Sequence, residues 1–399
     1  MTRHSPDLAP HDPVYLDHNA TTPVDADVLA AMLPFLREEF GNPSSSHPAG
    51  RRARAAVETA RAEVAALIGA RADEIVFTSG GTESSNMAIR GAAAAREGRP
   101  GVVTTAFEHP ATEECCRLLE RHGHPVRRVA PRRDGRITAD DVITSIDDTT
   151  ALVTLIHAQN EIGTLQPVAE IAPAARGRGV WVHADAAQSL GKVPVDVDVL
   201  GVDLLTVAGH KLYAPKGIGA LYVRRGIDLP PLLAGAGQEH GRRPGTENVA
   251  FVVGLGAACR IAAARLEQDA ARSRVLAAGL LARLRAAVPG LILVGDPDTR
   301  LPNTLNVLFP GVSGRRLLEA CPGVLASTGS ACHAGSEAPS AVLLALGLAP
   351  DTALGAVRLS LGRATTTAAV ATAADRLAAA WRTLRDTAVP APRHSGALS

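Results

Sequence analysis

Between Glu74 and about Arg225, short apolar runs alternate with alanine-rich amphipathic stretches. The runs EIVFTS, VVTTAF, ALVTLIHA, VWVHADA, LLTVAG and GALYVRR have the length and apolar content of buried strands, and several of the stretches between them have helical spacing. Strands that alternate with helices form a mainly parallel sheet covered by helices. The sequence therefore predicts an α/β fold for this part of the chain.

A second, smaller unit is expected after this sheet. The alanine- and leucine-rich stretch from Val249 to Ala287 predicts one or two long helices that lead out of it. The runs NTLNVLFP, GVLASTG and AVRLSLG then resemble strands, with helices at 314–320 and 340–346 and a closing helix from Thr366 to about Arg385. We expect a large domain at 24–255, a small domain made of 14–23 and 256–387, and flexible tails at 1–13 and 388–399.

Charge and cysteine content narrow the class of protein. Lys plus Arg number 41 and Asp plus Glu number 40, so no strong field attracts nucleic acid or an anionic membrane, and a phosphate site has to be built locally. Five cysteines without a CxxC pair argue against a disulfide framework and against a structural zinc site. The first residues contain no apolar signal segment, and the apolar stretch from Val249 to Ala263 is interrupted by Arg260. We expect a cytoplasmic protein without a bound metal.

The segment GHKLYAPKGIGALYVRR indicates a reactive lysine. Lys211 is expected to end one strand, and a Gly/Pro-rich turn at 215–219 precedes the next. A lysine at such a strand end can reach a cleft, although a lone lysine is most often a solvated one.

A second polar residue follows a neighbouring strand. In VHADAAQSLGK, Asp185 ends the strand and Gln188 comes three residues later. Strand ends of this kind meet at one sheet edge, where cofactors bind, and an aspartate there suits a protonated pyridine nitrogen. The alternatives are that Asp185 caps a helix, or that it ligates a metal together with His183, but an HxD pair supplies only two ligands.

A third element, FTSGGTESSNMAIRG, predicts a strand, a turn at Gly80 and Gly81, and a helix that begins near Thr82. Backbone amides at a helix start and the Thr82 hydroxyl form a phosphate seat without net positive charge. A merely tight strand-to-helix connection is the commoner explanation of two glycines. The segment is neither a GxGxxG nor a GK[ST] motif, which disfavours dinucleotide and P-loop binding.

Together these elements resemble the cysteine desulfurases and the related selenocysteine lyases, which are class V aminotransferase-like enzymes of fold type I. The resemblance spans nearly the whole chain. It rests on YLDHNATTP, FGNPSSSHPAG, FTSGGTESSN, EHPA, NEIGTLQP, HADAAQSLGK, GHKLYAPKGIGALYV, GQEHGRRPGTENV, LPNTLNV, STGSACHAGS and VRLSLGR. It implies pyridoxal phosphate as the cofactor, a large domain with a mainly parallel seven-stranded sheet, and a smaller α+β domain.

The resemblance also implies roles for individual residues. Lys211 would hold the cofactor as a Schiff base, and Asp185 would pair with the pyridine nitrogen. The remaining residues would surround the ring, the phosphate and the substrate. His109 stacks on the ring, Gln188 and Asn160 contact the ring oxygen, Gly81, Thr82 and His210 hold the phosphate, Thr246 reaches it from the second subunit of a homodimer, and Arg358 binds the substrate carboxylate with help from Asn42 and Asn160.

Cys332 is the expected sulfur acceptor. It lies in STGSACHAGSEAPS, whose small and polar residues are typical of a mobile loop and are poor core formers. As a thiolate, with a pKa lowered by His333 or by the cofactor, it would attack the substrate sulfur, leaving alanine and a persulfide. Cys115, Cys116, Cys259 and Cys321 are most simply packing residues on helices or helix ends.

Three alternatives stay open at this point. His333 and the sequence RRPGTENV look more like selenocysteine lyases, so L-selenocysteine competes with the more abundant L-cysteine as the substrate. An aminotransferase or another carbon–sulfur lyase on this fold would use Lys211 but not Cys332. A non-catalytic sulfur-transfer scaffold would need neither.

Ala208 stands where many relatives have a serine that contacts the phosphate. A persulfide would pass to a protein acceptor such as an iron–sulfur scaffold, a tRNA-thiolation enzyme or a sulfur carrier.

Overall fold

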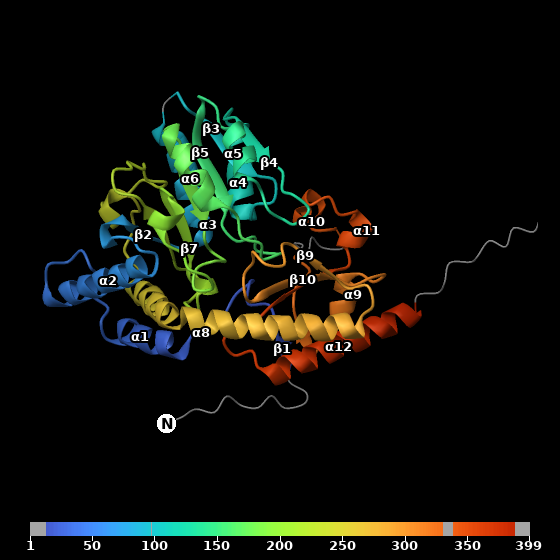
Figure 1. Cartoon of the computed structure of the whole chain (residues 1–399). Coiled ribbons are helices and arrows are strands. Elements are labelled where there is room, and N and C mark those ends of the chain that lie inside the picture. The colour runs from blue at the N-terminus through green and yellow to red at the C-terminus, as the bar shows by residue number, and fades with distance from the viewer. Residues whose placement is uncertain (1–12, 97, 330–337, 388–399) are drawn as a thin grey trace, which may run out of the picture.

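A seven-stranded sheet forms the centre of the larger part of the molecule (Figure 1). The computed structural model describes residues 13–96, 98–329 and 338–387. The strands lie in the order β2-β8-β7-β6-β5-β3-β4, and β8 alone is antiparallel to its neighbours. The predicted mainly parallel α/β sheet is therefore confirmed. Its strands are β2 (Ile75–Thr78), β3 (Gly101–Thr105), β4 (Val126–Val129), β5 (Thr150–Ile156), β6 (Trp181–Asp185), β7 (Leu204–Ala208) and β8 (Gly219–Val223).

Both faces of this sheet are covered by helices. Adjacent strand residues point to opposite faces, and accordingly Val76 and Leu204 belong to one apolar cluster while Phe77 and Leu205 belong to another. Burial on both faces explains why central strands such as β5 and β7 are largely apolar in the sequence. The helices of this part are α1 (Ala26–Arg37), α2 (Pro48–Leu67), α3 (Gly81–Ala95), α4 (Pro110–Arg121), α5 (Ala139–Ser145), α6 (Val168–Gly177) and α7 (Val197–Leu200).

The long helix α8 (Val249–Ala287) joins the two parts of the molecule as a single helix (Figure 1). It packs against α1 and α2 and, further along, against the closing helix α12 (Thr367–Thr387). By length and composition α8 is apolar enough to cross a membrane, but 56% of its most apolar window is buried inside the protein. This is a weak indication of a membrane span, because buried core helices have the same character.

The smaller part contains a three-stranded antiparallel sheet in the order β12-β10-β9 and a two-stranded parallel sheet of β1 and β11. Val14 and Leu16, from the start of the chain, share an apolar cluster with Leu280 and Trp381. Val14 and Leu16 are therefore packed among residues of the last third of the chain. The elements are β1 (Val14–Tyr15), β9 (Ile292–Val294), β10 (Thr304–Leu308), β11 (Val324–Leu325), β12 (Ala356–Ser360), α9 (Gly314–Glu319), α10 (Ala341–Ala345) and α11 (Pro350–Ala353).

Candidate functional site

A cavity of about 250 Å³ lies where the carboxyl ends of β5, β6 and β7 meet the first turn of α3. This is the sheet edge at which the sequence predicts a cofactor site. Nine of the predicted site residues line it: Gly81, Thr82, His109, Asn160, Asp185, Gln188, His210, Lys211 and Arg358. Asn19, Ala20, Ala111, Ile156, Ala187 and Ala208 complete the wall.

Lys211 and Asp185 come from adjacent strands. Asp185 is the last residue of β6 and its Oδ1 accepts the N–H of Ala187 at 2.9 Å. Strand β7 ends at Ala208, so Lys211 lies one short helical turn (Gly209–Lys211) beyond the strand and not at its last residue as expected. Burial lowers the pKa of Lys211 to about 8, Asp185 opposes this shift, and Arg358 adds to it. The neutral amine that a nucleophile or base requires is therefore accessible near neutral pH.

His183 is a structural residue of the sheet and not half of a metal pair with Asp185. Its two ring nitrogens hydrogen-bond the hydroxyls of Thr154 at 2.8 Å and Thr206 at 2.9 Å. Burial lowers its pKa to about 4, so the ring is neutral and satisfied within the sheet. Within the described residues, no group of three or more His, Cys, Asp or Glu side chains is arranged to hold a metal ion.

The first turn of α3 offers backbone donors to the cavity. Gly80 precedes the helix with a φ of 150°, a conformation that favours glycine, and no side chain caps the helix start. His210 also lines the cavity, and its Nδ1 shares a hydrogen bond of 3.2 Å with the Thr21 hydroxyl. Burial, with nearby Lys211, lowers the pKa of His210 to about 4. A phosphate here would meet uncapped amides, the Thr82 hydroxyl and a neutral imidazole.

His109 has a fixed orientation because it is the N-cap of α4. Its Nδ1 accepts the N–H of Ala111 at 3.1 Å, which leaves the proton on Nε2. Burial lowers the pKa of His109. The preceding Glu108 ties this turn to β5, since its Oε1 accepts the N–H of Ile156 at 3.1 Å and the Thr105 hydroxyl bonds to the same oxygen. The ring is therefore neutral and held in place.

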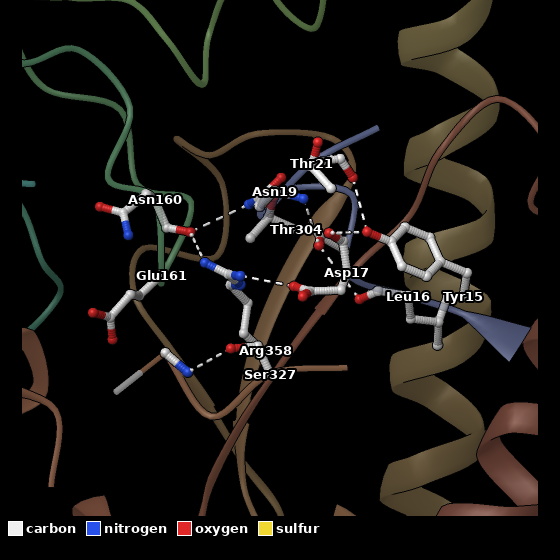
Figure 2. A network of polar contacts seen from close by, with 12 residues as sticks. Tyr15, Leu16, Asp17, Asn19, Thr21, Asn160, Glu161, Thr304, Ser327 and Arg358 are labelled. Atoms are coloured by element: carbon white, nitrogen blue, oxygen red, sulfur yellow. Dashed lines mark hydrogen bonds and ion pairs between the residues drawn. The ribbon is translucent and has the colours of Figure 1, made fainter. Parts of the chain in front are cut away.

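Arg358 lies at the centre of a polar network (Figure 2). One terminal nitrogen pairs with Oδ1 of Asp17 at 2.7 Å, and the other donates to the Asn160 carbonyl at 3.1 Å. Its buried Nε has no hydrogen-bond partner among the residues that the structure describes. The guanidinium is held by two neighbours and still has an unused donor, which suits a ligand carboxylate.

Two residues of the network were missed by sequence reasoning. Asn19 lines the cavity, and its Nδ2 donates to Thr304 at 2.9 Å and to the Asn160 carbonyl at 3.3 Å (Figure 2). Asp17, two residues earlier, supplies the ion pair to Arg358. Both residues belong to the motif YLDHNATTP. The motif itself does not indicate which distant residues Asp17 and Asn19 contact in the fold.

Asn42 and Thr246 do not line this cavity. Both are exposed, and the Asn42 Oδ1 accepts the N–H of Ser44 at 2.9 Å in its own turn. Cys332 and His333 lie outside the described residues. The described strand-like segment that leads toward them is close to the cavity, because Ser327 and Arg358 exchange backbone hydrogen bonds of 2.6 and 3.3 Å (Figure 2).

Comparison with known proteins gives one consistent relationship. The family model "Aminotransferase class-V" matches residues 14–372. The chain is 45% identical to a cysteine desulfurase of Nostoc sp. over 90% of each chain, and 44% identical to the cysteine desulfurase NifS of Azotobacter vinelandii over 88% of this chain and 89% of that one. A solved NifS-like protein superposes with a TM-score of 0.86 at 34% identity, covering 94% of this chain and 100% of that one. The structure of SspA in complex with cysteine gives 0.77 at 37% identity, covering 87% and 98%.

Proposed function

The chain belongs to the aminotransferase class-V family, and the relatives named above are cysteine desulfurases. We propose that it is a pyridoxal-phosphate-dependent cysteine desulfurase. It converts L-cysteine to L-alanine and leaves the sulfur as a persulfide on Cys332, from which a protein acceptor takes it. The observation that carries this proposal is the meeting of Lys211, Asp185 and Arg358 at one cavity. A selenocysteine lyase is the less favoured alternative, since the relatives above are cysteine desulfurases.

The residues at the cavity fit pyridoxal phosphate. Lys211, with its lowered pKa, suits covalent attachment, and Asp185 suits the pyridine nitrogen. The uncapped first turn of α3, with Thr82 and His210, suits the phosphate even though Ala208 offers no hydroxyl there. His109, which lines the cavity and is held as the N-cap of α4, is the residue that would stack on the ring. When bound, the cofactor supplies an electron sink for the substrate α-carbon.

The chain's own groups then have separate tasks. Arg358 binds the substrate carboxylate through its unused donor, and Lys211, as the neutral amine, takes the α-proton. The Cys332 thiolate forms a bond to the substrate sulfur while the carbon–sulfur bond breaks. The substrate β-carbon keeps the electron pair of the broken bond and gains a proton. The enzyme thiol and cysteine therefore give a persulfide and alanine, with atoms and electrons balanced.

A homodimer is part of the proposal. Thr246 is exposed and does not line the cavity of its own chain, which is compatible with a contact to the phosphate of a second copy. An apolar stripe on and after α1 supports such a partner: Leu29, Leu33, Leu36 and Phe40 are 47%, 41%, 55% and 87% exposed. Contiguous exposed apolar residues commonly mark an interface. Asn42 adjoins this stripe, so it acts at a cavity only if the dimer brings it there.

Two further proposals concern organisation and location. We assign residues 24–255 to a large domain and 14–23 with 256–387 to a small one, supported by the separate apolar cluster that contains Val14, Leu280 and Trp381. The four cysteines in the described part of the chain are all free thiols, which supports a reducing, cytoplasmic location. The balanced charge supports small-molecule and protein partners, not nucleic acid or membrane.

The experiment that tests the function measures alanine and sulfide released from L-cysteine by the purified protein, with L-selenocysteine assayed in parallel. We expect turnover of cysteine, loss of persulfide formation in Cys332→Ala with the cofactor absorbance kept, and little change in Cys321→Ala, a buried thiol used as the matched control. Reaction of selenocysteine alone would make the protein a selenocysteine lyase. Unchanged cysteine turnover in Cys332→Ala would support a carbon–sulfur lyase, and absence of bound cofactor would support a scaffold.

A further inference from the structure

Lysine is nearly absent from this chain. Of its 41 basic residues only three, Lys192, Lys211 and Lys216, are lysines, and the rest are arginines. Lys216 is exposed, whereas Lys211 lines the cavity. Lys192 has no task in the mechanism above, yet it is only partly exposed and lies behind the cavity wall, where it lines a neighbouring cavity of about 40 Å³ together with Lys211.

Lys192 contacts two side chains of the cavity wall. Its Nζ donates to Oε1 of Gln188 at 2.8 Å and to Oδ1 of Asn19 at 3.2 Å. Gln188 and Asn19 are each about 1% exposed and both line the cavity. Burial, with the nearby charges of Lys211 and Arg358, holds the pKa of Lys192 well below its usual value. Burying a lysine in this position costs folding free energy. The interactions that it provides in return are its hydrogen bonds to Gln188 and Asn19.

These contacts determine which end of each amide faces the cavity. The Nζ group acts as a donor, so both amide oxygens turn toward it and both amide nitrogens turn away. One N–H of Gln188 Nε2 donates to the Asn19 carbonyl at 2.9 Å. The other N–H remains for the cavity. Gln188 therefore offers the cavity a donor, and a ligand atom beside it has to be an acceptor.

We propose that Lys192 is a positioning residue that locks the amide of Gln188 so that its N–H donates to the ring oxygen of the cofactor. This rests on the proposed function, because it names pyridoxal phosphate as the occupant. The ring oxygen of pyridoxal phosphate is an acceptor that ionises, and a donor beside it favours the ionised form. Without Lys192 the amide can rotate by half a turn and present its oxygen, which repels an ionised ring oxygen.

The geometry at this position suits lysine better than arginine. The lysine amino group is compact and donates to two oxygens of different side chains, whereas the planar fork of arginine matches two oxygens in one plane. Gly191 precedes Lys192 with a φ of 72°, and a Cβ there would lie 2.3 Å from the Leu212 side chain. The turn that carries Lys192 is thus closely packed and leaves little room for a larger group.

The test uses the full chain with bound cofactor and titrates the visible cofactor absorbance with pH. In Lys192→Met the midpoint of this titration should rise by roughly one pH unit, because the ionised ring oxygen loses a donor worth about one ordinary hydrogen bond. Affinity of the cofactor-free protein for pyridoxal phosphate should fall roughly tenfold. The matched control Lys216→Met, at the exposed lysine, should leave both values unchanged.

A second variant separates positioning from folding. If Lys192 acts through Gln188, then Lys192→Met should shift the midpoint by less than about a third of a pH unit in a Gln188→Leu background, as coupled residues are non-additive. An equal shift in both backgrounds, or no shift in wild-type background with the melting temperature maintained, overturns the proposal. If the wild-type protein itself gives no cofactor band, the proposed function fails, and that result is distinct from failure of the role of Lys192.

Discussion

The two walls of the cavity are built in different ways. The sheet wall consists of Asp185, which ends strand β6, and of Lys211 and Thr82, which follow β7 and β2 of the same sheet within a few residues. The closing wall consists of Asn19 and Arg358, which are far apart in sequence and meet through the network of Figure 2. The sheet wall is fixed by strand packing, whereas the closing wall depends on contacts of residues 17 and 19 and of Arg358 with residues distant in the sequence.

From this difference we infer that the sheet wall binds the cofactor and the closing wall binds the substrate. A rigid set of residues suits a cofactor that stays bound, and a wall joined by a few polar contacts suits a substrate that enters and leaves. We therefore expect changes in the sheet wall to remove the cofactor, and changes in the closing wall to affect substrate binding while the cofactor remains.

The largest effect is expected at Lys211. Lys211→Ala removes both the attachment point and the base, so the visible cofactor band should disappear and cysteine turnover should fall by at least about 10²–10⁴-fold. Absorbance and alanine release measure these two outcomes. Lys216→Ala, at an exposed lysine five residues further along the chain, provides the control. A visible band of normal intensity in Lys211→Ala would show that the sheet wall does not attach the cofactor.

A change at Arg358 tests the closing wall. Arg358→Ala should raise the KM for cysteine by about 10–100-fold, since a charge-assisted hydrogen bond to the carboxylate is worth about 1.5–3 kcal/mol. The cofactor band should persist, because Asp185 and Lys211 are untouched. Loss of the band in this variant would contradict the division of the cavity into two walls.

The sheet wall was predictable from the strand pattern, whereas in the closing wall Arg358 was expected only from the family resemblance and Asn19 was not expected. Lys211, Asp185 and Thr82 each stand next to an apolar run, and residues at the carboxyl ends of neighbouring parallel strands converge by geometry alone. Asp17 forms its ion pair with a residue 341 positions away, and no local pattern contains that information. Lys192 is a similar case, since the segment that contains it does not indicate a contact with Asn19, 173 positions away.

Strand β4 of the central sheet was not predicted from the apolar pattern. The segment Val126–Val129 forms β4 at the sheet edge, but Arg127 and Arg128 make it polar in sequence. Arg128 is stabilised there by Glu113 and Glu120 of α4 at 3.0 and 2.7 Å. Long-range ion pairs thus permit an edge strand that the apolar pattern does not indicate.

A smaller effect is expected from Asp17. Asp17→Asn keeps the size of the side chain but removes the charge that orients Arg358 at 2.7 Å. We expect the KM for cysteine to rise about 3–10-fold, the equivalent of roughly 0.5–1.5 kcal/mol, with kcat and the cofactor band little changed. Steady-state kinetics measure this, and Asp27→Asn on the exposed side of α1 is the control. A fall in KM would mean that Asp17 competes with the substrate carboxylate for Arg358 and does not position it.

The smallest effect is a charge coupling between the two walls. In cofactor-free protein the pKa of Lys211 is about 8, lowered by burial and by Arg358 and raised by Asp185. Its reaction with pyridoxal phosphate needs the neutral amine, so the rate should increase as pH rises through about 8 and then level off. Arg358→Ala should move this midpoint upward and Asp185→Asn should move it downward, each by a fraction of a pH unit. Because Arg358 belongs to the closing wall, an unmoved midpoint in Arg358→Ala would mean that the walls are electrostatically independent, whereas the predicted shift would make the closing wall a contributor to the reactivity of the lysine as well as to substrate binding.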